Sequence, residues 1–169
     1  MKAEASRVRI TPLHFAWIRL TVVEVAAVTD PTTPAHHGGC HCGAVQFAFA
    51  TQRALPDFTP RACDCDFCMR HRAAWISDAA GRLRITASDA LRRYRQGSGQ
   101  AEFLFCGHCG VLVAAASTGA DGVLRGAINR NSFDERELFA AEVAASPQQL
   151  APDAKLARWS QLWTPAFLD

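Results

Sequence analysis

Seven cysteines, gathered in three short stretches, constrain the fold of this chain more than any other feature. The groups are Cys40 and Cys42, then Cys63, Cys65 and Cys68, then Cys106 and Cys109. Cysteines one or two positions apart rarely meet the Cα and Cβ separations that a disulfide needs, and an odd number leaves one unpaired. The same close spacing is what a single metal ion requires of two ligands on one turn. The pattern therefore predicts thiolate metal sites and a reducing compartment, the cytoplasm.

Two of the three groups supply one complete set of zinc ligands. Both lie on glycine-flanked turns, 38–43 and 106–110, where glycine lets the backbone fold around an ion and point amides at the sulfurs. Zinc takes four such ligands tetrahedrally. Closed sites of this kind are structural, and their binding energy contributes to folding. We therefore expect a structural zinc held by Cys40, Cys42, Cys106 and Cys109.

The remaining cysteines, Cys63, Cys65 and Cys68, form a set of three. Three protein ligands are usual for a catalytic zinc, whose fourth position is left for water or substrate. One alternative is that His71 closes the site, and another is that the three thiols are buried without a metal. The four-plus-three division therefore predicts two zinc ions per chain, one of them in an open site.

Other polar residues near the cysteines have simpler expected roles. We expect His41 and His108 to point away from the ion, and His36 and His37 to be solvated next to a turn-forming stretch. The carboxylates between the ligands are expected to face solvent or to accept backbone N–H bonds, with proton transfer as the alternative; they are Asp64 and Asp66.

Charge and hydropathy exclude two classes of partner. The formal charge is +2, and counting seven thiolates and two zinc ions brings it close to zero. This argues against a nucleic-acid binder, although seven arginines gather between Arg70 and Arg95. The apolar run 13–28 is interrupted by Arg19 and Glu24, so it falls short of the ~18 uncharged residues that a membrane span needs. We expect neither a span nor a signal peptide.

The chain is predicted to be mainly β. Alternating apolar residues indicate short antiparallel strands, and a capping-box spacing predicts a helix over 132–144. A second helix is expected near Asp153, with Leu156, Trp159 and Leu162 on one stripe. The organisation is then an N-terminal extension (1–35, an extra strand or a mis-set start), a two-zinc domain (36–145) and a tail with a short helix (146–169). The strands are expected at 44–49, 74–76, 83–85, 91–95, 102–105, 111–115 and 123–128, with a hairpin turn at 96–99.

The cysteine groups and their flanks resemble the glutathione-dependent formaldehyde-activating enzyme family, which shares its domain with centromere protein V. The matching stretches are 38–45, 63–70, 94–110 and 128–134. The resemblance implies a β-tent fold with C-terminal helical segments and the same division of the cysteines, with chemistry assigned to the set of three. The sequence departs from the family between Met69 and Trp75 and after Leu150, where substrate contacts are least well defined.

The resemblance implies a carbon–sulfur lyase-type enzyme similar to S-(hydroxymethyl)glutathione synthase. Such an enzyme condenses glutathione, or a related thiol, with formaldehyde or a similar aldehyde to a hemithioacetal. Arg70 and Arg72 are candidates for pairing with the glutathione carboxylates, the alternative being a solvated basic face. The rival function is a non-catalytic two-zinc module that recognises a thiol, a protein or nucleic acid. The sequence carries no signal for an oligomeric state.

Overall fold

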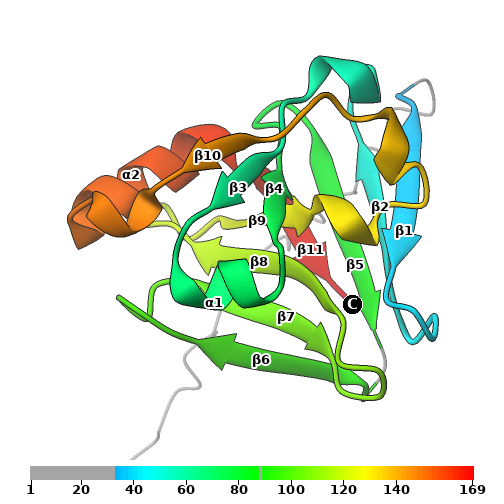
Figure 1. The fold of residues 1–169 in the computed structure, drawn as a ribbon, viewed down its shortest axis with the longest axis horizontal. Coiled ribbons are helices and arrows are strands. Elements are labelled where there is room, and N and C mark those ends of the chain that lie inside the picture. Colours follow the sequence, from blue (N-terminus) through cyan, green and yellow to red (C-terminus); the bar gives the residue numbers. More distant parts are fainter. Residues whose placement is uncertain (1–32, 88) are drawn as a thin grey trace, which may run out of the picture.

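Short strands are the main regular element of the computed structural model, which describes residues 33–87 and 89–169 (Figure 1). The expected extension 1–35 therefore lies, up to residue 32, outside the described residues. The prediction of a mainly β fold is confirmed. The strands are β1 (Ala35–Gly39), β2 (Val45–Ala50), β3 (Arg61–Cys63), β4 (Ala74–Ile76), β5 (Arg82–Ala87), β6 (Leu91–Arg95), β7 (Glu102–Cys106), β8 (Leu112–Thr118), β9 (Leu124–Asn129), β10 (Val143–Ala145) and β11 (Thr164–Leu168).

The strands form two sheet regions that β11 joins. On one side β1, β2 and β5 pair in antiparallel order, and β11 adds parallel to β5. On the other side β6, β7, β8 and β9 form an antiparallel meander. β11 and β4 both pair with the edge of β9 that lies opposite β8. β3 then pairs with β4, and β10 pairs with β3 in parallel. Figure 1 shows these regions as two walls that meet along β11.

The meander separates two apolar cores because neighbouring side chains in a strand point to opposite faces. Ala114, Leu104 and Ile128 face the larger core, where they join the apolar residues of β2 and β5. Their neighbours Ala115, Phe103 and Ala127 face a second core with Trp75 and Trp163. The strands predicted from alternation are confirmed, with ends within a few residues of those expected.

The predicted helix over 132–144 is wrong. This stretch holds the single 3₁₀ turns η2 (Arg130–Ser132) and η3 (Arg136–Leu138), followed by β10. The Ser132 hydroxyl donates to the Leu112 carbonyl instead of capping a helix, and Phe133 forms a bridge with Gly38 of β1. Phe133 is 1% exposed and packs edge-on against Phe47, so burial of this ring outweighs the local helix signal.

The turn-forming stretch before the first cysteines also ends in a strand that alternation did not reveal. His36 and His37 lie in β1; the His37 side chain is exposed as expected, but His36 is half-buried and its Nδ1 lies 3.1 Å from Glu135 Oε2. The strand formed because β2 provides a full antiparallel partner for it.

Two α-helices flank the second core. α1 (Asp66–Arg70) includes Cys68, the last cysteine of the middle group, and α2 (Pro152–Leu162) confirms the predicted C-terminal helix. Further 3₁₀ turns are η1 (Leu55–Asp57) and η4 (Pro147–Gln149). Within the described ranges, no helix has the length and apolar character needed to cross a membrane.

Candidate functional site

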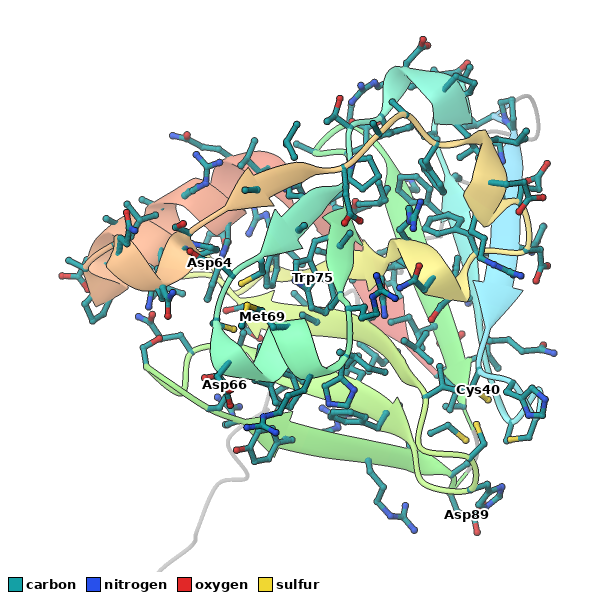
Figure 2. All side chains as sticks on the ribbon, viewed as in Figure 1. Cys40, Asp64, Asp66, Met69, Trp75 and Asp89 are labelled. Carbon is teal, nitrogen blue, oxygen red and sulfur yellow. The ribbon has the colours of Figure 1, made fainter. Side chains whose placement is uncertain are left out.

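The seven cysteines gather into two separate groups in space. The four-cysteine cluster consists of Cys40, Cys42, Cys106 and Cys109, and the three-cysteine cluster of Cys63, Cys65 and Cys68. Within each cluster all the ligand atoms lie within 4.8 Å of one another. Figure 2 labels Cys40 on one side of the molecule and Asp64, which lies within the three-cysteine cluster in sequence, on the other. Each cluster could hold one metal ion.

The four-cysteine cluster is built from two turns of the same design. The amide of Cys40 bonds to the carbonyl of Val45 at 2.8 Å, and the amide of Cys106 to that of Val111 at 3.0 Å. Each turn includes a glycine with positive φ, Gly43 at 78° and Gly110 at 77°, a conformation that other residues rarely adopt. The turns thus bring the β1–β2 and β7–β8 connections together at one point.

The spacing of these sulfurs fits a tetrahedral metal. Cys42 Sγ lies 3.6 Å from Cys40 Sγ and 3.5 Å from Cys106 Sγ. A tetrahedron with Zn–S bonds of about 2.3 Å has sulfurs about 3.8 Å apart. The Val45 amide also donates to Cys40 Sγ at 3.2 Å, and backbone amides lower the pKa of Cys109 to about 6. Amide donors of this kind favour thiolates, the form that binds metal.

The three-cysteine cluster lies where β3 passes into α1. Cys63 ends β3, Cys65 stands immediately before α1 and Cys68 lies within it. The helix ends after one turn because Arg72 adopts a φ of 47° and the amide of Ala73 returns to the Cys68 carbonyl at 2.9 Å. This tight reversal fixes all three sulfurs on one side of the loop.

The three thiols change one another's ionisation. A hydrogen bond from the Cys68 thiol lowers the pKa of Cys63 to about 6, and the same contact together with burial raises the pKa of Cys68. Burial likewise raises the pKa of Cys65. Three thiolates side by side therefore need a cation between them, and a divalent metal bound by sulfur meets that need.

The three-cysteine cluster opens into a cavity of about 340 Å³, whereas the four-cysteine cluster does not line it. This volume is in the range of sites that hold whole small molecules. The other lining residues come from β3, β4, the β6–β7 turn, β7, β8 and the segment from β10 to the end of α2. They are Arg61, Trp75, Gln96, Gly97, Ser98, Ala101, Phe103, Ala115, Ala145, Pro147, Gln148, Lys155, Arg158, Trp159, Leu162 and Trp163.

The cavity favours anions. Its lining includes Arg61, Lys155 and Arg158 but no Asp or Glu. Among the described residues, no carboxylate pairs with any of these three cations. Arg61 donates to Ser77 Oγ at 2.6 Å, and burial, together with the charge of Arg158, lowers its pKa. Unpaired cations in a partly enclosed space attract carboxylates and phosphates.

Two polar side chains connect the metal loop to the cavity walls. Gln96, from the β6–β7 turn, donates its Nε2 to Cys65 Sγ at 3.7 Å. Asp64 accepts hydrogen bonds from Ser146 Oγ and from Gln148 Nε2, the latter at 3.1 Å. The sequence suggested solvent or backbone partners for Asp64; its carboxylate instead holds the segment that leads into α2, which covers the cavity.

The other candidate site residues, His71, Arg70 and Arg72, lie outside the cavity lining. His71 is not part of the three-cysteine cluster. Its ring packs against two aromatic rings, with centroid distances of 4.8 Å to Phe67 and 5.3 Å to Phe105. Arg70 pairs with Asp66 at 2.9 Å on the surface, and exposed Arg72 closes α1. Arg61, Lys155 and Arg158 were missed because only the fold brings β3 and α2 to the same cavity.

The arginine-rich stretch is partly neutralised. Arg93 and Arg95 both pair with Glu102 at 2.8 Å, and Arg84 pairs with Asp169 at 2.8 Å. Together with Arg70, four of the seven arginines between Arg70 and Arg95 thus have a carboxylate partner. This reduces the basic surface that nucleic acid would require.

Comparison with known proteins identifies the relatives of this chain. The family described as "Glutathione-dependent formaldehyde-activating enzyme" matches residues 35–155, which include all seven cysteines and most of the cavity lining. A crystal structure of a Rhodobacter sphaeroides protein is similar, with 25% identity and a TM-score of 0.50. That alignment covers 64% of this chain and 99% of the other. The chain belongs to the glutathione-dependent formaldehyde-activating enzyme family.

Proposed function

We propose that the protein is a zinc-dependent carbon–sulfur lyase-type enzyme. It joins glutathione, or a related thiol, to formaldehyde or a similar aldehyde as a hemithioacetal. One observation carries the proposal: the three-cysteine cluster, unlike the four-cysteine cluster, opens into a cavity with unpaired cations and no carboxylate. A thiol that carries carboxylates matches this combination.

In this proposal the two clusters hold zinc for different purposes. The four-cysteine cluster saturates its ion and stabilises the fold. The three-cysteine cluster leaves one position for an external ligand. Zinc bound there supplies positive charge, which favours the thiolate form of an incoming thiol and polarises a nearby carbonyl oxygen.

The side chains of the cavity bind and orient the thiol. Lys155 and Arg158 are three positions apart on α2, so they lie on neighbouring positions of one helix face. With Arg61 they form the cationic group that pairs with the carboxylates of the thiol. Arg70 and Arg72 lie outside the lining, so the cavity cations take the role that the sequence suggested for them.

The reaction conserves atoms and electrons. The thiol gives its proton to solvent, and its sulfur forms a bond to the carbonyl carbon. The π pair of the carbonyl moves to oxygen, which takes up one proton from solvent. The cavity contributes by holding sulfur and carbonyl within bonding reach, which replaces a chance encounter by a fixed geometry. The reverse reaction breaks the same carbon–sulfur bond.

Exchange NMR tests the proposal, because the uncatalysed reaction reaches equilibrium and the enzyme changes only its rate. Glutathione and formaldehyde are mixed with the metal-loaded protein, and exchange between free and hemithioacetal signals is measured. We expect faster exchange with the wild type and no acceleration with folded Cys65→Ser. Binding of glutathione without any acceleration would instead support the two-metal binding module.

A further inference from the structure

The floor of the cavity is a hollow in the sheet with aromatic sides. Ala115 of β8 pairs directly with Phe103 of β7 on one side and with Ala127 of β9 on the other. Trp75 of β4 pairs with Asn129, two residues further along β9, so it shares their face. Ala115 is 2% exposed, with Trp75 and Phe103 below 10%. Alanines at the centre and large rings at the edges create a hollow that is lined mainly by apolar atoms.

Beyond its two cations, the end of α2 gives the roof of the cavity an apolar part. Trp159 and Leu162 lie at helical spacing at the end of α2, Trp163 follows directly after the helix, and all three line the cavity. The two tryptophan rings stack with centroids 4.6 Å apart and an interplanar angle of 19°. These rings therefore form a second apolar wall over the sheet.

The proposed substrates leave these apolar walls without a function. The carboxylates of glutathione pair with cations, and its backbone is polar throughout. Formaldehyde contributes a single carbon, which water converts largely to a polar hydrate. Desolvated aromatic surface that contacts no apolar ligand forgoes the gain from burial. The lining therefore fits a substrate with a hydrocarbon group next to the reacting sulfur.

We propose that the apolar half of the cavity binds the hydrocarbon part of the aldehyde, so that this protein favours aldehydes with an alkyl chain or an aromatic ring over formaldehyde. The inference rests on the proposed function and specifies its carbonyl substrate. The thiol sulfur forms a bond to the aldehyde carbon, the carbonyl π pair moves to oxygen, and this oxygen gains the proton that balances the one lost by the thiol. The chain or ring stays intact between the sheet and α2.

The experiment compares aldehydes of increasing length with one thiol. Exchange NMR with glutathione measures the acceleration that the metal-loaded wild type gives with formaldehyde, butanal and hexanal. Each buried methylene contributes about fourfold in affinity. At equal subsaturating concentrations we expect hexanal to show about 16-fold more acceleration than butanal, because it buries two more methylenes, and formaldehyde to show the least.

Two variants locate the effect. Ala115→Leu fills the hollow, so the ratio of the hexanal to the formaldehyde acceleration should fall at least fivefold. Ala157→Leu makes the same change at an exposed position of α2 and should leave this ratio unchanged. Circular dichroism checks that both fold. If Ala115→Leu does not, the partly exposed Trp159→Ala removes roof contacts and should lower the ratio severalfold.

The outcomes separate the inference from the function on which it rests. Equal acceleration of all three aldehydes, or the greatest acceleration with formaldehyde, overturns the apolar-substrate inference and leaves the proposed function intact. Acceleration of none overturns both. A hexanal preference that Ala115→Leu and Trp159→Ala leave unchanged places the hydrocarbon outside the cavity and also overturns the inference.

Discussion

The two cysteine clusters of this chain use the same ligand atoms in opposite surroundings. The four-cysteine cluster lies between two matched glycine turns, whose amides point at its sulfurs. The three-cysteine cluster lies on a one-turn helix and opens into a cavity of about 340 Å³. One has a full set of ligands and lies outside this cavity, while the other has one ligand fewer and lines it.

This contrast shows that the neighbours of a metal ligand, and not its residue type, suggest its role. Around the four-cysteine cluster the chain provides backbone amides and tight turns, which stabilise a fixed geometry. Around the three-cysteine cluster it provides unpaired cations and aromatic rings, which an internal metal site does not need. The following predictions test whether the clusters differ as their surroundings suggest.

The largest expected difference is in folding. Cys106→Ser should leave the chain unfolded or insoluble, because structural zinc contributes about 10–16 kcal/mol in small domains, as much as a whole domain's stability of about 5–15 kcal/mol. Cys65→Ser should remain folded and retain one metal ion. Far-ultraviolet circular dichroism and elemental analysis measure both. Equal loss of structure in the two variants would contradict the division.

A chelator should remove zinc from the two clusters at different rates. A chelator reaches the three-cysteine cluster through the cavity, so zinc should leave there at least ten times faster, without loss of secondary structure. Slower release from the four-cysteine cluster should coincide with unfolding. A colorimetric zinc assay run alongside circular dichroism follows both phases. Cys65→Ser should lack the fast phase, and a single phase in the wild type would show that the clusters are equally accessible.

A smaller effect is expected from the cations of the cavity. Lys155→Gln combined with Arg158→Gln should weaken glutathione binding several-fold, and less at high salt, because solvent screens charges near the surface. Arg70→Gln is the matched control, since Arg70 pairs with Asp66 outside the cavity. Calorimetric titration measures all three proteins. Equal weakening by Arg70→Gln would mean that the thiol binds beside α1 instead.

The most local effect should come from the carboxylates between the ligands. Asp64→Asn loses one of two charge-assisted hydrogen bonds to Ser146 and Gln148, each worth about 1.5–3 kcal/mol. Hydrogen exchange in β10 and α2 should therefore become about tenfold faster. Asp66→Asn should leave exchange there unchanged, because Asp66 pairs with Arg70 on the surface of α1. The same exchange rates in both variants would show that Asp64 does not hold this segment.

The sequence predicted much of what depends on local pattern, apart from the helix over 132–144 and strand β1. Cysteine spacing was enough to separate the two clusters, and alternation located most strands. The sequence did not reveal contacts that depend on tertiary structure. Ser132 fits the pattern of a helix cap, but its hydroxyl donates to the carbonyl of Leu112 in the folded chain. The sequence of the C-terminal stretch likewise did not predict that β11 pairs with β5 and β9. Arg61 and Arg158 lie far apart in sequence and meet only at the cavity.

The strands at either end of α2 have a consequence for how this fold could be altered. β10 is paired with β3 and β11 with β5 and β9, so the segment between them is fastened at both ends. That one continuous stretch, 147–163, contributes charged, polar and aromatic lining but no metal ligand. Recombination or design could therefore exchange this peptide as a cassette, changing which molecules the cavity accepts while the metal chemistry beneath is inherited unaltered.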